Sequence, residues 1–138
     1  MTAKTVELSF PAKSHYLVLA RLSVAGVAPI VGLNAEQLAD LKLAVTEACA
    51  NVVRHAYPEG APGDVHLRMF VEDGAVSIEV TDTGRGMSEP PRLVWDAEAL
   101  HEQGMGLTIV QSVVDELVID SPPAGGTVVR FRKVLSVA

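Results

Sequence analysis

The sequence has little cysteine and few basic residues, and both shortages exclude classes of function. Cys49 is the only cysteine, which excludes an internal disulfide and any zinc site built from several cysteines. Lysine and arginine number 11 against 17 aspartates and glutamates, so the formal net charge is −6. A nucleic-acid-binding protein needs a basic surface, and this chain as a whole lacks one. An anionic ligand would have to be held by backbone N–H groups, a few placed side chains and a metal ion.

The chain also lacks a secretory signal and a clean membrane-spanning run. The N-terminal residues show no signal-peptide pattern. Residues 16–33 form the most apolar stretch, but Arg21, Gly26 and Pro29 interrupt it. A membrane span needs roughly 20 cleanly apolar residues, so this stretch is expected to be a buried helix. We therefore expect a cytoplasmic protein with no membrane partner.

Length and composition predict one globular domain over residues 1–138. This length lies near the commonest domain size, and 49% hydrophobic with 20% charged residues is ordinary for a folded chain. Alternating apolar residues indicate strands, and apolar residues three and four apart indicate helices. Strands are predicted at residues 5–10, 65–71, 76–80, 116–120 and 127–135, and helices at 12–31, from the Asn34 N-cap to the break at 57–63, and at 105–115.

This order of elements predicts the α+β fold class. Helices and strands do not alternate strictly, which excludes a doubly wound parallel sheet. We expect a two-layer sandwich with a mixed, mainly antiparallel sheet and helices on one face. The strand at residues 5–10 is terminal and is expected at an edge. Residues 83–103 show no sustained period, and loops of this length are usually lids or binding loops.

Glu47, Asn51 and His55 follow one another at intervals of four residues, so they lie one turn apart on one flank of the second helix. This flank lies roughly 120° from the leucine stripe, at the border of the core. Glutamate supplies a carboxylate base, and asparagine supplies a neutral oxygen ligand suited to Mg²⁺. A solvated polar flank is the alternative that these residues alone leave open.

Asp82 continues the inward-facing alternation of Val76, Ile78 and Val80. Its carboxylate is therefore expected on the core side of the sheet, where the strand ends. Because burying a carboxylate without hydrogen-bond donors is costly, Asp82 needs a partner. A ligand amino group would serve, and so would a turn in which Asp82 accepts from the backbone N–H of Gly84 or Arg85.

Two glycine pairs flank the unpatterned loop, Gly84 with Gly86 and Gly104 with Gly106. Glycine permits a close approach of the backbone to a ligand. The second pair opens a predicted helix, whose free N–H groups and dipole favour an anion. Either pair alone is a weak signal, but both pairs in order with Asp82 and the Glu47 flank are a stronger one.

Four segments, taken in order, resemble the motifs of the GHKL ATPases. Residues 47–57 resemble the N-box, residues 82–87 the first glycine box, residues 104–107 the second, and Gly126-Thr127 the closing threonine motif. The resemblance covers nearly the whole chain and implies the Bergerat ATP-binding fold. The small size and helix-rich N-terminus are most similar to the bacterial anti-sigma-factor serine kinases.

This resemblance implies an enzyme that uses ATP and Mg²⁺, sequesters a sigma factor and phosphorylates an anti-anti-sigma (STAS-type) protein on serine. It implies that Glu47 is the catalytic base and that Asn51 binds Mg²⁺. Asp82 would accept from the adenine amino group, with Thr127 beside it. The other nucleotide-binding residues it implies are His55, Gly84, Gly86, Met87, Gly104, Met105, Gly106 and Leu107.

The resemblance also implies a homodimer and a partner-contacting arginine, Arg21, on the first helix. A surface arginine whose stem packs along the helix is the other interpretation of Arg21. The predicted edge strand at residues 5–10 has unpaired backbone groups, with which a second copy of the chain could pair.

One departure from the family pattern lies in the loop. We expect a basic residue just ahead of the second glycine box, near the γ-phosphate, where this chain has Leu100-His101-Glu102-Gln103. Arg85, Arg92 or His101 would have to substitute, and without a substitute turnover is expected to be slow. A nucleotide-gated regulatory module with little or no kinase activity is therefore the alternative function. The catalytic domain of a histidine kinase is disfavoured, because the segment before the motifs leaves little room for a dimerising helix that carries a phosphoacceptor histidine.

Overall fold

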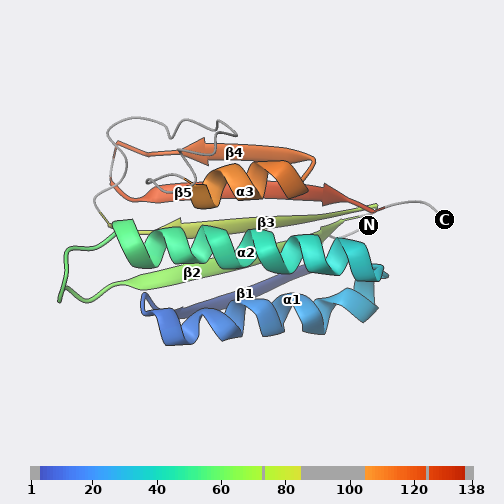
Figure 1. The fold of residues 1–138 in the computed structure, drawn as a ribbon, viewed down its shortest axis with the longest axis horizontal. Helices are drawn as coiled ribbons and strands as arrows, with labels where there is room; N and C mark the ends of the chain where they lie inside the picture. The colour runs from blue at the N-terminus through green and yellow to red at the C-terminus, as the bar shows by residue number, and fades with distance from the viewer. Residues whose placement is uncertain (1–3, 73, 85–104, 124, 136–138) are drawn as a thin grey trace.

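A single antiparallel sheet with all three helices on one face makes up the computed structural model, which describes residues 4–72, 74–84, 105–123 and 125–135 (Figure 1). The strand order is β1-β2-β3-β5-β4. The described strand pairings are antiparallel throughout, because β2–β3 and β4–β5 are hairpins and β5 returns beside β3. The α+β class and the two-layer arrangement are confirmed, and the sheet is simpler than the mixed sheet we expected.

The elements follow the predicted order along the chain, and β1 lies at an edge of the sheet as expected. Their ends agree with the prediction to within two residues, except at the start of the first helix. The strands are β1 (Lys4–Pro11), β2 (Asp64–Glu72), β3 (Ala75–Asp82), β4 (Glu116–Asp120) and β5 (Thr127–Val134), and the helices are α1 (Leu17–Val31), α2 (Ala35–His55) and α3 (Met105–Val113).

The first helix begins later than the sequence pattern indicates. A short 3₁₀ turn, Ser14–Tyr16, precedes α1. The backbone is still extended at Lys13, with φ of −132° and ψ of 142°, and the Ala12 N–H donates to the Gly63 carbonyl at 2.9 Å, which holds this segment beside β2. At its other end α1 runs through Pro29 and stops at Gly32, which takes a left-handed conformation with φ of 79°.

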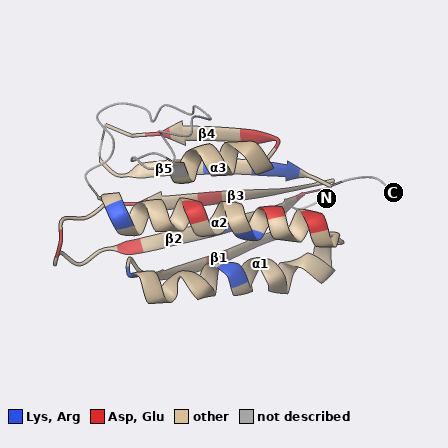
Figure 2. Cartoon of the chain, in the orientation of Figure 1, with Lys and Arg blue, Asp and Glu red and all other residues tan. Residues whose placement is uncertain are grey.

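The buried-helix prediction for this segment is right for one face only. Ala20, Val24 and Val27 are buried, whereas Leu22 is 61% exposed and Ile30 is 69% exposed. Residues Ser14–Val31 are long and apolar enough to cross a membrane by length and composition, and 22% of that stretch is buried. Figure 2 shows α1 with a single charged residue, Arg21, while charges of both signs lie along α2.

The long helix α2 forms for the reasons that its sequence gives. The Asn34 side chain accepts from the Gln37 N–H at 2.8 Å, and the Gln37 side chain accepts from the Asn34 N–H at 3.0 Å, which completes the predicted capping box. The apolar stripe of the helix is buried against the sheet and the neighbouring helices. Its buried members include Leu41, Val45, Ala48 and Val52.

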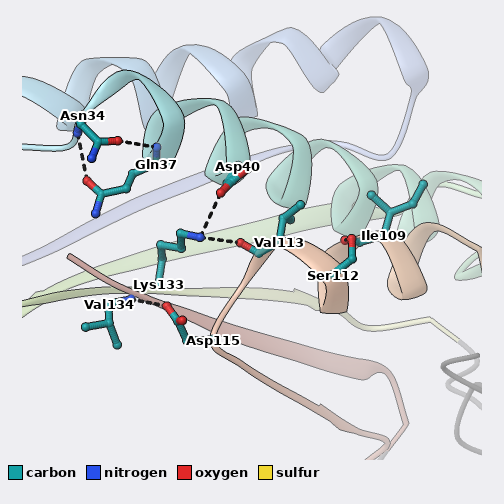
Figure 3. Close-up of polar contacts among 9 residues, drawn as sticks. All are labelled: Asn34, Gln37, Asp40, Ile109, Ser112, Val113, Asp115, Lys133 and Val134. Atoms are coloured by element: carbon teal, nitrogen blue, oxygen red, sulfur yellow. Dashed lines mark hydrogen bonds and ion pairs between the residues drawn. The ribbon is translucent and has the colours of Figure 1, made fainter. Parts of the chain in front are cut away.

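Polar contacts around Lys133, near the C-terminal end of β5, fix α3 relative to α2 and β5. The Lys133 ammonium group on β5 donates to the Asp40 carboxylate on α2 at 3.0 Å and to the Val113 carbonyl at the end of α3 at 2.9 Å (Figure 3). Asp115 accepts from the Val134 N–H at 2.7 Å. Because the Lys133 contacts are partly buried, they hold the end of α3 beside α2 and so help to place its N-terminus.

Candidate functional site

Two groups of candidate residues from other parts of the chain pack against the C-terminal half of α2 and the residue that follows it. Gly84, just beyond β3, packs so closely that a Cβ there would lie 2.0 Å from the Ala56 carbonyl oxygen. Gly106, in the first turn of α3, would place a Cβ 3.1 Å from Glu47 Oε2. Residues 47 and 56 are separated by about 13 Å along a helix. We call the Asp82–Gly84 end the base end and the Glu47–Gly106 end the phosphate end, after the roles that the family resemblance predicts for these residues.

Asp82 is the buried anchor of the base end. It is 7% exposed, and its Oδ1 accepts from the Gly84 N–H at 2.9 Å. Burial raises the pKa of Asp82 above its ordinary value, although the Gly84 and Thr127 backbone N–H groups pull that pKa down. The turn that we considered as an alternative is therefore present. An ionised carboxylate has about four acceptor positions, so these donors leave room for a ligand amino group as well.

Thr127 lies directly beside Asp82, as the closing motif implied. The two residues are opposite each other in the β3–β5 register, and Thr127 is buried. Gly126 precedes it with φ of 83°, and a Cβ there would lie 2.2 Å from the Asp82 carbonyl oxygen. The Gly126 N–H donates to the Gly84 carbonyl at 3.0 Å. Only glycine permits this close approach, which joins the strand exit of β3 to the start of β5.

Asn51 lies between the two ends, one turn after Glu47 and one turn before His55. It is 7% exposed, and within the described ranges no hydrogen bond joins its amide group to another residue. The amide atoms are not enclosed, so this group is available to a ligand. The solvated-flank alternative is wrong for Asn51, because the side chain is buried.

The phosphate end combines a carboxylate, a guanidinium group and the start of a helix. Glu47 is partly buried, and its Oε2 lies 3.9 Å from an Arg54 terminal nitrogen on the same helix. A Cβ on Gly106 would lie 3.3 Å from that guanidinium group. At this distance and with Arg54 half exposed, the ion pair is weak. Both groups therefore remain able to rearrange around a ligand.

Arg54 is the residue that the sequence reasoning missed. The family pattern predicts a cation in the loop before the second glycine box, whereas in the folded chain α2 supplies one, Arg54, beside Glu47 and Gly106. A signal was present in the sequence, because Arg54 follows Glu47 by seven residues, which is close to two full helical turns on the same flank.

Some candidate residues fall outside the described residues or apart from this cluster. Met105 opens α3, and Leu107 is fully buried behind it. Arg21 is half-buried on α1. Cys49 is buried, and burial raises the pKa of its thiol to about 12, which excludes a reactive thiolate there. The candidates outside the described residues are Arg85, Gly86, Met87, Arg92, His101 and Gly104.

The donor set at the site fits a nucleotide-bound Mg²⁺ better than a metal held by the protein alone. Among the described residues, no group of three or more His, Cys, Asp or Glu side chains is placed to hold a metal ion. Mg²⁺ commonly takes one or two protein oxygens together with substrate phosphates and water. The buried Asn51 amide can supply one such oxygen, and the rest would come from the phosphates.

Comparison with known proteins agrees with this geometry. Residues 10–133 match the family model described as a histidine kinase-like ATPase domain. The anti-sigma F factor of Caldanaerobacter subterraneus subsp. tengcongensis is 38% identical over 93% of this chain and 92% of that protein. The serine-protein kinase RsbW of Bacillus pumilus is 33% identical over 98% of this chain and 88% of that protein.

A solved structure shows the same fold. The RsbU and RsbW domains of a Mycobacterium tuberculosis protein align with a TM-score of 0.73 and 21% identity, over 98% of this chain and 33% of that one. Residues 10–133, which match the family model, contain the Glu47–Asn51 flank, the Asp82 turn, the start of α3 and Thr127. This chain belongs to the family of histidine kinase-like ATPase domains.

Proposed function

We propose that this chain is an ATP-dependent protein serine kinase that also acts as an anti-sigma factor. The observation that carries the proposal is that three groups lie along α2: the buried Asp82 carboxylate, the Asn51 amide, which has no hydrogen bond among the described residues, and the Glu47 carboxylate beside the start of α3. Relatives that match along nearly their whole length are named for these two activities. A fold alone would not separate this function from others on the same scaffold.

At the base end, Asp82 would accept a hydrogen bond from the amino group of adenine. Its raised pKa reflects burial with too few donors, and a purine amino group supplies the missing donor. Guanine carries a carbonyl oxygen at that position and would place an acceptor against the carboxylate. The geometry therefore favours ATP over GTP as the phosphate donor.

At the phosphate end, the backbone N–H groups at the start of α3 would bind phosphate oxygens. Asn51 would supply an oxygen ligand to Mg²⁺, which when bound neutralises phosphate charge during transfer. Glu47 would accept the proton of a substrate serine as its oxygen bonds to the γ-phosphorus and the bond to the β-phosphate oxygen breaks, which releases ADP. Arg54 would offset the negative charge near Glu47.

The test is transfer of labelled γ-phosphate from Mg·ATP to purified STAS-type proteins of the same organism. We expect label on one of them, and no label on that substrate when its acceptor serine is replaced by alanine. Calorimetry with Mg·ATP and Mg·GTP should show binding of the adenine nucleotide alone. A chain that binds neither nucleotide contradicts every site role proposed for Asp82, Asn51 and Glu47.

The alternative function is a nucleotide-gated module that holds its partner without phosphoryl transfer. The observation that favours it is the absence of a Lys or Arg in the four residues before Gly104. The two functions differ in one result, because the module would bind Mg·ATP and a sigma factor yet transfer no label. Arg54 at the phosphate end makes the kinase the better supported of the two.

Partner binding is proposed to involve α1 and a second copy of the chain. Arg21 and the exposed apolar residues Leu22 and Ile30 lie on this helix, which suits it to a protein surface. Arg21→Ala should lower affinity for the sigma factor and leave Mg·ATP binding unchanged. Sedimentation should report a dimer. A sigma factor works with the transcription machinery, so a cytoplasmic location follows from the proposed partner.

A further inference from the structure

Tyr57 joins three parts of the chain at the base end. It follows Ala56, the C-cap of α2, and its hydroxyl group donates to the Asp64 carbonyl at the start of β2 at 2.7 Å. The same hydroxyl accepts from the Thr83 N–H at 3.1 Å, just beyond the end of β3. One side chain therefore connects the α2 terminus, the β2 entry and the β3 exit.

The hydroxyl group takes the place of a missing rung between β2 and β3. The ladder ends at the pair His66 with Thr81, so the same register continued by two residues would place Asp64 opposite Thr83. These residues carry the carbonyl and the N–H that Tyr57 satisfies. The hydroxyl group therefore bridges the two strands beyond the last pair of their ladder.

The ring of Tyr57 is held in a fixed position. It packs against the hydrophobic core, and Gly63 lies over its face, so closely that a Cβ on Gly63 would lie 2.4 Å from three ring atoms. A tyrosine side chain has few rotatable bonds, and here the packing leaves it little room to turn. The hydroxyl group is therefore a rigid support for the Thr83 peptide.

The Thr83 peptide determines how the Asp82 carboxylate is oriented. Thr83 lies between Asp82, whose carboxylate accepts from the Gly84 N–H at 2.9 Å, and Gly84, whose carbonyl accepts from the Gly126 N–H at 3.0 Å. Any rotation of the Thr83 peptide changes the direction of the Asp82 side chain and the position of its Gly84 donor. The hydrogen bond from the Thr83 N–H to the Tyr57 hydroxyl group therefore fixes both the Asp82 side chain and the Gly84 N–H.

We propose that the Tyr57 hydroxyl group is a positioning group that sets the direction of the Asp82 carboxylate for recognition of the nucleotide base. This inference rests on the proposed function and names a determinant of its base specificity. Tyr57 acts through Asp82 and touches no reacting atom. Its loss should weaken ground state and transition state binding equally, which raises KM and leaves kcat unchanged.

The experiment compares Tyr57→Phe with the matched control Tyr16→Phe, which removes the hydroxyl group of the other tyrosine, on the 3₁₀ turn before α1. Tyr57→Phe should raise KM for ATP about fivefold with kcat within about twofold, whereas Tyr16→Phe should change neither. The preference for ATP over GTP should fall in Tyr57→Phe alone. A merely structural role would lower the melting temperature without moving this preference.

A double-mutant cycle with Asp82→Asn tests whether Tyr57 acts through Asp82. If it does, Tyr57→Phe in the Asp82→Asn background should cost little further affinity for Mg·ATP, because the group that it positions has been altered. Gly63→Ala is a second variant, since its Cβ displaces the ring and should reproduce the rise in KM.

Three results would overturn the inference. They are a KM unchanged in Tyr57→Phe, losses that add fully in the double variant, and a fall in kcat with no change in KM. Failure of the proposed function gives a different result, because the wild-type chain would then release no heat on titration with Mg·ATP.

Discussion

The base end and the phosphate end are built in opposite ways. At the base end, Asp82 is buried, its turn is closed by the Gly84 and Gly126 contacts, and Gly84 packs against the Ala56 backbone. At the phosphate end, Glu47 and Arg54 lie 3.9 Å apart and are partly exposed. A rigid end can select one base by hydrogen-bond geometry, while a loosely paired end can rearrange as charge moves.

This contrast has a physical cause. A base is neutral and flat, so discrimination depends on directed hydrogen bonds in a desolvated setting. A triphosphate is highly charged and is bound through electrostatics that tolerate small displacements. The two ends should therefore respond differently to substitution, and four predictions test this difference.

The largest effect is expected at the phosphate end. Glu47→Gln removes the base that would accept the serine proton, so the transfer rate should fall by about 10²–10⁴-fold, with Mg·ATP affinity changed by less than about threefold. Transfer of labelled phosphate and calorimetry measure the two quantities. Glu36→Gln, which changes an exposed glutamate in the first turn of the same helix, is the control. Transfer that persists in Glu47→Gln at the wild-type rate would remove Glu47 from the mechanism.

Two glycine substitutions compare the packing of the two ends directly. Gly84→Ala places a Cβ 2.0 Å from a backbone carbonyl oxygen, which cannot move away, and should lower the free energy of unfolding by about 3 kcal/mol. Gly106→Ala places a Cβ 3.1 Å from the end of the Glu47 side chain, which can turn aside, so its cost should stay below about 1 kcal/mol. Urea unfolding measures both. Equal costs would mean that the ends are equally rigid.

Asp82→Asn should separate stability from binding. Because burial raises the pKa of Asp82 in the folded state, the folded chain holds that proton more tightly than the unfolded chain. Stability should therefore fall as pH rises from the ordinary aspartate pKa through the raised value, and it should stay lower above that window. Asp82→Asn should abolish this pH dependence and raise the melting temperature of the nucleotide-free protein at neutral pH.

The same variant should lose Mg·ATP affinity by about tenfold, because a neutral acceptor replaces a charged one. Thermal melts from acid to neutral pH, repeated with nucleotide, measure both effects. Asp64→Asn, an exposed aspartate at the start of β2, is the control. If the melting temperature of nucleotide-free Asp82→Asn fell together with its Mg·ATP affinity, Asp82 would have a structural role in the fold and not a specific role in binding the nucleotide.

The smallest effect is expected for Arg54→Gln. The weak ion pair with Glu47 contributes little to stability, so the melting temperature should hardly change. Mg·ATP affinity should fall about fivefold and adenosine affinity should not change, since only phosphate groups reach this end. Arg130→Gln, which alters an ion pair on the opposite face of the sheet with Glu79, is the control. Equal losses of affinity for ATP and adenosine would contradict the proposal that Arg54 acts on the phosphate groups.

Local pattern was sufficient for most of the fold. The Asn34–Gln37 capping box, the α2 stripe and the alternation in β2 and β3 depend on neighbours within a few residues, and each is present as predicted. The start of α1 could not be predicted this way, because it depends on a hydrogen bond from Ala12 to Gly63, far away in the sequence.

For the site, the sequence by itself determined which residues can do the chemistry. Helix and strand periods singled out Glu47, Asn51 and Asp82, and the resemblance to the GHKL ATPases added Thr127. Only the tertiary structure decided that the start of α3 packs against the flank of Glu47 and Arg54, and that the Tyr57 hydroxyl group bridges β2 and β3 beyond their last pair. Both depend on contacts between segments that the chain brings together when the helices pack on the sheet. Local periodicity carries no information about such contacts, because it fixes the face on which a side chain lies and not the element that meets that face.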